Sequence, residues 1–209
     1  MSEHRKRRTQ AERTEASDNA MYKAAVALIA RDGPSKMTLS ELGKTAGFSG
    51  ALVSYRFGSK SNMLQATAKR ILQLWRERMI EPALHAEPGL DNVKRMTQIY
   101  LAAVKARSDI MLAQYRLMHE SYTGFTELRP IFEASDEQSR EEIVAQLKHA
   151  QMTGEIDPDL DLAAFALSFV GTQHGIATQY FINPNAMDLD RVYRSLEYQL
   201  DVLRIDQKS

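Results

Sequence analysis

The segment from residue 38 to residue 60 reads Thr38-Leu-Ser-Glu-Leu-Gly-Lys-Thr-Ala-Gly-Phe-Ser-Gly-Ala-Leu-Val-Ser-Tyr-Arg-Phe-Gly-Ser-Lys60 and carries the strongest structural signal in the sequence. Thr38 and Ser49 are each suited to cap the amino end of a short helix, and Glu41 would complete a capping box with Thr38. Gly47 stands in the turn between the helices, where φ must be positive. The segment therefore predicts a helix-turn-helix with helices over about 38–45 and 49–56.

The residues around the turn indicate how the two helices would pack. Gly43 is small where the second helix must cross close to the first, and the apolar residues near it would face a preceding long helix. The second helix then presents a mostly small surface that can approach base edges. That surface consists of Ser49, Gly50, Ala51, Leu52, Ser54 and Tyr55. Capped pairs of short helices also occur in all-α proteins that do not bind DNA, so the pattern alone leaves the function open.

Helical spacing continues on both sides of this segment. Ser17 or Asp18 would cap a helix that ends at Asp32-Gly33-Pro34, and Ser59 would cap a long helix reaching about Ile80. A linker over 82–89 follows, and further helices are expected over 91–107, 109–120, 128–152, 161–182 and 188–204. We predict an all-α protein of about nine helices. It would comprise a flexible basic arm (1–16), a three-helix helix-turn-helix domain (17–65), and a helical ligand-binding and dimerisation domain (66–209) reached through the long helix.

The net charge of zero conceals an uneven distribution. Residues 1–80 carry 15 basic and 7 acidic side chains, whereas residues 81–209 carry 12 basic and 20 acidic ones. A basic front part and an acidic back part suggest that only the front meets a polyanion such as DNA. A solvated charged surface is the alternative interpretation of the same numbers.

Several function classes find no support in the sequence. The absence of cysteine excludes disulfides, thiolate metal sites and cysteine nucleophiles. There is no glycine-rich phosphate loop, no zinc-protease motif and no nucleophile elbow, so we expect no enzyme, no cofactor and no metal. Asp157, Asp159 and Asp161 alternate as in a calcium loop, but Pro158 favours a helix-capping turn. The basic amino terminus lacks a following apolar run and no apolar run is long enough to span a membrane, so we expect a soluble, cytoplasmic protein.

The segment 38–60 resembles the DNA-binding segment of the tetracycline-repressor (TetR) family. The shared elements are the threonine before the first short helix, the Ala-Gly-Phe-Ser turn at 46–49, and Phe57-Gly58-Ser59-Lys60 before a leucine-containing helix. The family commonly has tyrosine three residues before the phenylalanine, where this chain has Ser54 followed by Tyr55. Such a variant is similar to choline-responsive regulators of that family. The resemblance covers about residues 17–65 and implies a dimeric, ligand-responsive transcriptional regulator, usually a repressor.

Roles in DNA binding follow for individual residues. The helix amino ends at Thr38 and Ser49 can face phosphates, and Lys60 would supply a point charge for the backbone. Ala51 or Leu52 could meet a thymine methyl group, while Ser54 and Tyr55 can form hydrogen bonds with bases or phosphates. Arg5, Lys6, Arg7, Arg8 and Arg13 form a basic arm that could enter the minor groove or serve only as a solubilising tail.

A second group of residues predicts a ligand pocket in the C-terminal part. Aromatic residues and methionines recur there at helical spacing among few polar groups, which suits a small apolar, aromatic or quaternary ammonium effector. Ordinary core packing is the alternative for the same stripe. The candidate lining residues are Trp75, Met79, Tyr100, Val104, Met111, Tyr115, Met118 and His119.

The last two helices predict a homodimer interface. Gly171 and Gly175 lie four residues apart in helix 161–182 and permit a close approach of another helix, while helix 188–204 carries a second apolar stripe. Together they could form a four-helix interface. A DNA-bound adaptor that contacts a protein partner instead of a small molecule is an alternative function, and a small helical enzyme is a remote one.

Overall fold

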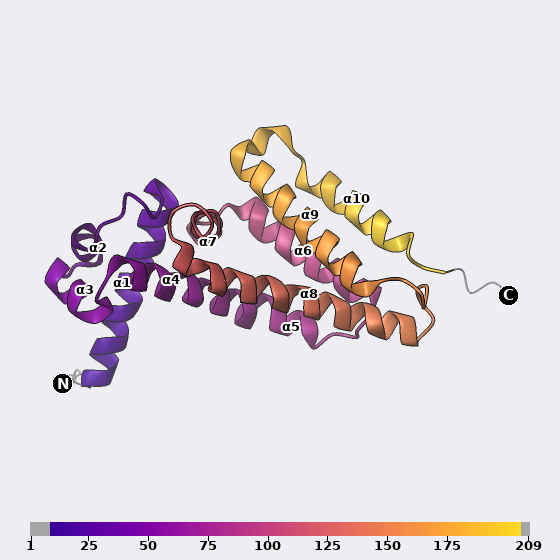
Figure 1. Cartoon of the computed structure of the whole chain (residues 1–209), viewed down its shortest axis with the longest axis horizontal. Coiled ribbons are helices and arrows are strands. Elements are labelled where there is room, and N and C mark those ends of the chain that lie inside the picture. The colour runs from indigo at the N-terminus through magenta and orange to yellow at the C-terminus, as the bar shows by residue number, and fades with distance from the viewer. Residues whose placement is uncertain (1–8, 206–209) are drawn as a thin grey trace, which may run out of the picture.

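The computed structural model describes residues 9–205, and these residues form an all-α structure, as predicted (Figure 1). The first part of the chain contains α1 (Gln10–Asp32), α2 (Leu39–Ala46), α3 (Gly50–Phe57), α4 (Lys60–Trp75) and α5 (Glu81–Leu84). The rest contains α6 (Leu90–Ala106), α7 (Asp109–Glu120), α8 (Arg129–Met152), α9 (Leu162–Ile182) and α10 (Leu189–Asp201). Because α4 continues into α5 through a π-helical turn (Arg76–Ile80), the ten α-helices form nine rods.

The first helix begins earlier than the sequence pattern indicates. Thr9 caps it, since its Oγ1 accepts a hydrogen bond from the Glu12 amide (3.2 Å) and the Glu12 carboxylate accepts one from the Thr9 amide (2.6 Å). Ser17 and Asp18, the two predicted caps, both lie inside the helix, and Ser17 donates to the Thr14 carbonyl (2.7 Å). The prediction of a flexible arm is therefore wrong for residues 10–16, while the basic residues 5–8 lie outside the described residues.

The caps of the next three helices lie where the sequence places them. The Ser49 and Ser59 hydroxyls accept hydrogen bonds from the amides of residues 52 and 62, both at 3.1 Å. Thr38 likewise accepts from the Glu41 amide at 3.1 Å. The predicted capping box is only half formed, because the Glu41 carboxylate pairs with Arg31 of α1 at 3.1 Å instead of returning to Thr38.

The long rod that starts at Lys60 is interrupted near its end. A π-helical turn over Arg76–Ile80 follows Trp75, and α5 continues to Leu84. Pro82 lies in α5 directly after this turn, so the predicted linker at 82–89 begins only after Leu84. π-Helical turns are rare, and they often accompany functional sites.

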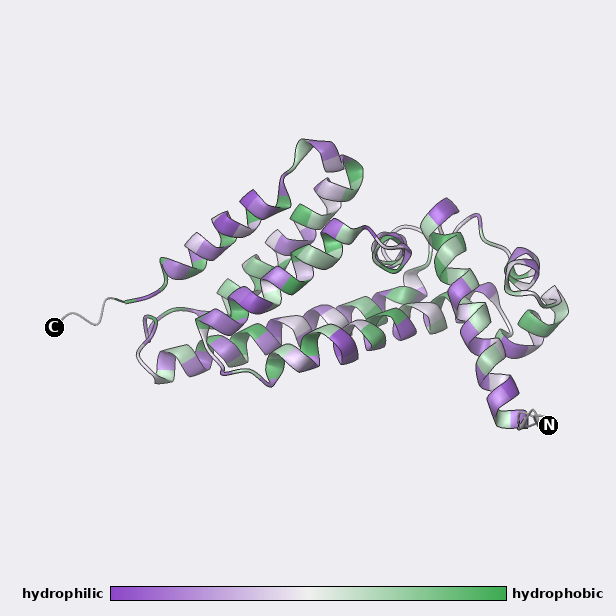
Figure 2. Cartoon of the chain, turned by 180° about the vertical axis from the view of Figure 1, so that it is seen from behind, coloured by the Kyte–Doolittle hydropathy of each residue, from purple (hydrophilic) through white to green (hydrophobic). Residues whose placement is uncertain are grey.

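We call α1 to α3 with the first turns of α4 the head, and the remaining helices the body. In Figure 1, α4 and α8 run side by side beneath α6, α9 and α10. Hydrophobic and hydrophilic residues alternate along most helices, as expected for helices that each bury one face (Figure 2). The head is docked on the body, because the buried cluster around Leu28, Leu42 and Leu64 also includes Ala113 and Leu117 of α7.

A second buried cluster fills the body and contains residues from each of the helices α6, α7, α8, α9 and α10. Its large members include Leu90, Leu101, Leu147, Leu196 and Leu200. None of the helices in the described part has the combination of length and hydropathy that a membrane crossing requires. The carboxylates at 157–161 cap local turns, as the sequence suggested: Asp157 accepts from the Asp159 amide (2.8 Å) and Asp161 accepts from the Ala164 amide (3.0 Å).

Candidate nucleic-acid interface and ligand cavity

The turn between α2 and α3 brings two backbones into contact. Gly47 has φ 80° and ψ 26°, the left-handed conformation that glycine adopts without steric cost. A Cβ on Gly43 would lie 2.8 Å from the Gly50 amide nitrogen, and a Cβ on Gly50 would lie 2.9 Å from the Ser40 Cα. Both glycines are therefore required by the close crossing of α2 and α3.

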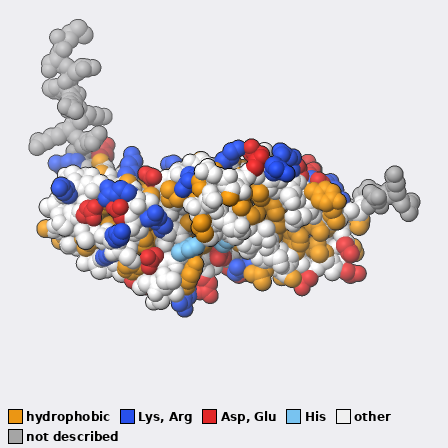
Figure 3. Space-filling view, turned by 90° about the horizontal axis from the view of Figure 1, so that it is seen from above, with side chains coloured by type: hydrophobic (Ala, Val, Ile, Leu, Met, Phe, Trp, Pro, Cys, Tyr) orange, Lys and Arg blue, Asp and Glu red, His pale blue; other side chains and the backbone are white. Residues whose placement is uncertain are grey.

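The outward face of α3 is formed by Ala51, Ser54 and Tyr55, which are all exposed, Tyr55 by 87%. Their spacing of three and four residues places them on one side of the helix. Two other predicted contacts serve packing instead: Gly50 abuts Ser40, and Leu52 is half-buried against the apolar cluster of the head. Lys and Arg side chains are frequent on the side of the head that Figure 3 shows. A small, uncharged helix face fits a DNA groove.

Both helix amino ends at this surface are accessible. Thr38 and Ser49 are exposed, and their hydroxyls each satisfy one backbone amide of the following helix. The remaining free amides and the positive end of the helix dipole make such ends suitable for phosphate oxygens.

Lys60 has specific partners within the protein. Its Nζ donates to the Ser35 carbonyl oxygen at 2.7 Å and lies 5.3 Å from the centre of the Phe125 ring. Burial lowers the pKa of this ammonium, while the nearby Glu120 carboxylate opposes that effect. The predicted phosphate contact would therefore involve a lysine that, in this conformation, connects the head to the segment after α7.

Two further hydrogen bonds join the head to the body near Lys60. Ser35 donates its hydroxyl to Glu120 at the end of α7 (3.0 Å), and Ser61 donates to Glu127 in the short turn before α8. The first residues of α4 are thus held on both sides by the segment that connects α7 to α8.

The body contains an inner cavity of about 70 Å³ enclosed by α4, α6, α7, α8 and α9. Three predicted ligand residues line it: Trp75, Tyr100 and Met118. The rings of Trp75 and Tyr100 meet edge to face, with centroids 6.3 Å apart and planes at 82°. Aromatic rings in this arrangement offer both apolar contact and a face that attracts cations.

Tyr100 lines the cavity, and Tyr115 lies directly behind it. The hydroxyls of Tyr100 and Tyr115 are hydrogen-bonded to each other, and Tyr100 also donates to the Gln173 carbonyl at 3.2 Å. Burial is the main reason that the pKa of each phenol lies above its ordinary value. Both hydroxyls therefore remain protonated donors over the physiological pH range.

Polar groups on the other wall come from three helices. The Asp136 carboxylate of α8 lies 3.9 Å from the Nε2 atom of His174 on α9. Burial raises the pKa of Asp136 and lowers that of His174, while their mutual attraction opposes both shifts. The Oε1 atom of Gln114 on α7 is buried without a hydrogen-bond partner among residues 9–205. A ligand with a polar group could satisfy these side chains.

The other predicted ligand residues lie elsewhere. Tyr115 and His119 line a separate pocket between the head and the body. Val104 is fully buried and Met111 is 4% exposed, both within the apolar cluster of the body. Met79 sits in the π-helical turn and lines none of these spaces. The helical spacing of Val104, Met111 and Met79 therefore reflects their packing or their position in a helix, and none of the three lines one of these pockets.

Sequence reasoning missed the contribution of α8 to the cavity. This helix supplies Phe132, Ser135, Asp136, Ser139, Glu142 and Ile143. Polar residues at 135, 136, 139 and 142 follow the three- and four-residue spacing of one helix face, which could have indicated a polar wall. Gln173 and His174 of α9 also line the cavity, and neither was among the predicted lining residues.

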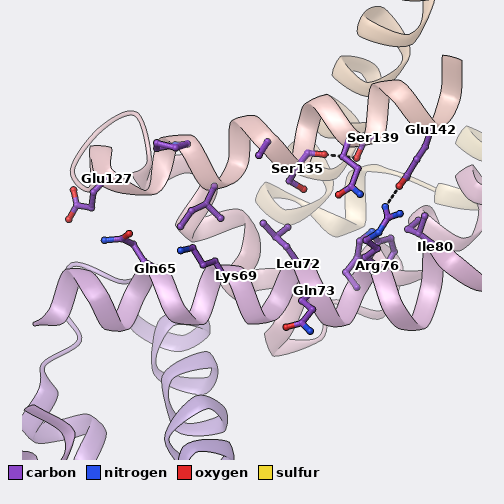
Figure 4. Close-up of a pocket in the computed structure, with 15 residues that line it drawn as sticks. Gln65, Lys69, Leu72, Gln73, Arg76, Ile80, Glu127, Ser135, Ser139 and Glu142 are labelled. Carbon is purple, nitrogen blue, oxygen red and sulfur yellow. Dashed lines mark hydrogen bonds and ion pairs between the residues drawn. The ribbon is translucent and has the colours of Figure 1, made fainter. Parts of the chain in front are cut away.

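An open groove of about 630 Å³ lies between α4 and α8 and shares a wall with the cavity (Figure 4). Leu72 and Ile80 line both spaces, as do Ser135, Ser139 and Glu142. Arg76 forms an ion pair with Glu142 at one end of the groove, at the start of the π-helical turn. Because Glu142 lines both spaces, this pair lies at their shared wall.

The outward face of α9 carries two glycines with open space above them. A Cβ on Gly171 or Gly175 would meet no atom within 4 Å, and Leu167 and Ile182 are 59% and 79% exposed. On α10, Tyr198 is 70% exposed. Apolar residues of this size are exposed together mainly where another surface covers them.

Comparison with known proteins relates both halves of the chain to one class. Residues 21–67 match the family of bacterial regulatory proteins named after tetR, and residues 90–204 match the C-terminal domain of BetI-type transcriptional repressors. No curated protein sequence matches the chain.

Solved structures with the same fold share little sequence with it. A transcriptional regulator from Saccharomonospora viridis in complex with choline has a TM-score of 0.81 at 18% identity, over 93% of this chain and 100% of that one. The transcriptional regulator FadR from Bacillus subtilis in complex with stearoyl-CoA has a TM-score of 0.76 at 20% identity, over 88% of this chain and 97% of that one. AibR in complex with isovaleryl coenzyme A and operator DNA has a TM-score of 0.71 at 17% identity, over 88% of this chain and 97% of that one. These similarities, the helix-turn-helix and the matched C-terminal domain together show that the chain belongs to the TetR family of DNA-binding transcriptional regulators.

Proposed function

We propose that this protein is a cytoplasmic transcriptional repressor that binds an inverted-repeat operator as a homodimer and is released by a small molecule. The observation that carries the proposal is the physical link between its two sites. The helix α4 begins with Lys60 in the head and ends with Trp75 at the inner cavity. A change at the cavity can therefore be transmitted to the DNA-binding surface.

The DNA contacts are proposed from the exposed face of α3. Ala51 is placed to meet a thymine methyl group, and the hydroxyls of Ser54 and Tyr55 can form hydrogen bonds with bases or phosphates. Thr38 and Ser49 would anchor phosphates at the two helix amino ends. In a dimer, the two recognition helices would enter major grooves about 34–36 Å apart, one turn of DNA.

Footprinting tests the DNA-binding half of the proposal. Fragments selected from genomic DNA should share a near-palindrome that the protein protects, and Ser54→Ala should reduce affinity for that sequence without changing non-specific binding. The exposed α6 variant Ala102→Leu serves as a control and should bind as the parent does. Selection that yields no common inverted repeat would contradict the proposal.

The α9 face is proposed as the centre of the dimer, with α10 beside it. The absence of side chains at Gly171 and Gly175 would let the α9 helix of the partner approach closely, and that helix would cover Leu167. Gly175→Leu introduces a side chain into open space within one protomer, so the fold should persist while dimerisation weakens. Sedimentation equilibrium measures this, with Ala102→Leu again as the control. An unchanged dimer would place the interface elsewhere.

The effector that the cavity supports best is a small quaternary ammonium compound, with compact apolar and aromatic compounds as the broader class. Trp75 and Tyr100 offer aromatic surfaces to a cation, and the Asp136 carboxylate adds negative charge. The structural relative from Saccharomonospora viridis was solved with choline, which belongs to this chemical class.

Entry of such a molecule would require movement. The cavity holds about 70 Å³, whereas small-molecule sites usually measure about 300–1,000 Å³. Widening it would displace Trp75, and with it the rod that leads to Lys60. A ligand that favours the widened state by a coupling free energy of about 1–3 kcal/mol would weaken operator binding roughly 5–150-fold.

Trp75 is the only tryptophan, so its fluorescence reports on the cavity directly. Choline should change this fluorescence and release the operator. Its neutral isostere, in which a tert-butyl group replaces trimethylammonium, should bind less tightly. Asp136→Asn should weaken binding of the cation but leave the isostere unaffected. If both compounds bind equally in the parent, the cationic effector class is wrong. If no small molecule alters the fluorescence or the DNA complex, the adaptor function replaces effector sensing.

A further inference from the structure

A second pocket, of about 550 Å³, lies where the head meets the body and is not used by the proposed function. Its walls come from Gly33 and Pro34 after α1, from Leu112, Tyr115, Arg116 and His119 on α7, and from Thr178, Phe181 and Ile182 at the end of α9. We call it the junction pocket. In Figure 3, histidine and hydrophobic side chains lie together along the seam between the head and the body.

The junction pocket is separate from the inner cavity. Tyr115 is their shared boundary: it lines the junction pocket, and its hydroxyl is bonded to Tyr100 of the inner cavity. The remaining lining residues of the two spaces differ. A molecule in the junction pocket would therefore occupy a distinct site.

Two arginines give this pocket a positive character. Arg107 and Arg116 line it, and neither forms an ion pair with an acidic side chain of residues 9–205. The hydrogen bond of Arg116 goes to the Ile29 carbonyl at 3.5 Å. Glu120 is the acidic lining residue, and it already accepts hydrogen bonds from Ser35 and Thr123. The guanidinium groups are therefore available to an anion.

The backbone at Arg107 supports a role for its side chain. This residue ends α6 with φ 45° and ψ 37°, and it is the only non-glycine residue with positive φ among residues 9–205. Glycine is the usual residue at such a helix end. Non-glycine residues in this conformation are uncommon, and they cluster at functional sites such as ligand clamps.

The rest of the pocket suits an apolar ring. The rings of Tyr115 and Phe181 meet edge to face with centroids 5.0 Å apart, and the ring centroids of His119 and Tyr122 are 5.8 Å apart. Tyr122 and Ile182 are 59% and 79% exposed at the rim. The volume lies within the range of about 300–1,000 Å³ that holds small organic ligands, and apolar walls with a few converging polar groups are typical of such sites.

We propose that the junction pocket binds a small aromatic carboxylate, with its carboxylate between Arg107 and Arg116 and its ring among Tyr115, Tyr122 and Phe181. The occupant would touch the head at Gly33 and Pro34 and the body at α7 and α9. It would therefore act as a second effector that fixes the position of the head on the body.

Calorimetric titration of the full-length protein with naphthoate tests this site. Its neutral amide, naphthamide, is the matched control ligand. Naphthoate should bind at one site per protomer and at least about tenfold more tightly than the amide, because hydrogen bonds to charged groups contribute strongly. Arg107→Gly and Arg116→Gln should each reduce naphthoate affinity towards that of the amide. Glycine suits the positive φ at position 107, so this variant is free of backbone strain.

Two further variants locate the bound molecule. Arg140→Gln removes an arginine of α8 that pairs with Glu137 outside the pocket, and it should leave naphthoate binding unchanged. Asp136→Asn alters the inner cavity and should also leave it unchanged. Equal affinity for acid and amide, or parental affinity in both Arg107→Gly and Arg116→Gln, would overturn the proposal. Loss of naphthoate binding in Asp136→Asn would assign the compound to the inner cavity and would also overturn it. The titration contains no DNA, so its outcome is independent of the proposed repressor function.

Discussion

Replacing Phe125 with leucine should tighten operator binding, because it weakens one of the contacts that hold Lys60 within the protein. The ammonium lies 5.3 Å from the Phe125 ring and 2.7 Å from the Ser35 carbonyl oxygen. We expect it to leave the ring when it approaches a DNA phosphate. A cation–π contact at such an accessible site contributes about 0.5–1 kcal/mol, and 1.4 kcal/mol corresponds to about a tenfold change in affinity. Phe125→Leu should therefore increase operator affinity by roughly two- to fivefold.

Fluorescence anisotropy with a labelled operator duplex, repeated over a range of salt concentrations, measures both affinity and phosphate contacts. Lys60→Ala should lower affinity and reduce the salt slope by about 0.9, the value for one phosphate contact. In the double variant, the gain from Phe125→Leu should vanish, since the lysine that it releases is absent. If Phe125→Leu has the same effect with and without Lys60, or if Lys60→Ala leaves the salt slope unchanged, the role assigned to Lys60 is wrong.

Three other outcomes follow from the geometry. Gly47→Val forces a β-branched residue to φ 80°, at a cost of about 1–3 kcal/mol, so operator binding should be lost while sedimentation still reports the parental oligomer. Gly43→Ala places a Cβ within 2.8 Å of the Gly50 backbone, which cannot yield as a side chain would, so α3 should shift and operator affinity should fall while the far-ultraviolet circular dichroism keeps its helical signal. Burial lowers the pKa of His174 below its ordinary value of 6.5, so the unfolded chain takes up a proton first and stability should decline as the pH falls through about 6.5. In an Asp136→Asn background, where the neighbouring carboxyl group no longer titrates, His174→Gln should remove that part of the decline in thermal melts.

Local chemistry explains which features could be predicted from the sequence. The caps at Ser49 and Ser59 and the left-handed Gly47 depend on residues within three or four positions, and all three are as expected. The start of α1 was misplaced because Ser17 and Asp18 are residue types that also favour helix amino ends, whereas the cap is Thr9. Thr9 gains a second hydrogen bond, because its amide donates to the Glu12 carboxylate and completes a capping box.

Contacts between distant segments explain what could not be predicted. Lys60 was expected to be free for a phosphate, but its partners, Ser35 and Phe125, come from a loop and a turn far away in the sequence. Val104 and Met111 have the same spacing as true lining residues, and only the packing of α6 and α7 decides that they are buried in the core. The α8 side of the cavity likewise depends on how that helix is rotated against α4 and α9.

The backbone contact between α2 and α3 has a consequence for how binding specificity can evolve. Because Gly43 and Gly50 bring main-chain atoms into contact at the crossing, the main chain itself constrains the angle between the two helices. Substitutions at Ala51, Ser54 and Tyr55 therefore alter the chemistry presented to a base without tilting the helix that presents it. Duplicated copies of such a gene can acquire new operators through a few substitutions on the exposed face of α3, while the geometry of the two helices is retained.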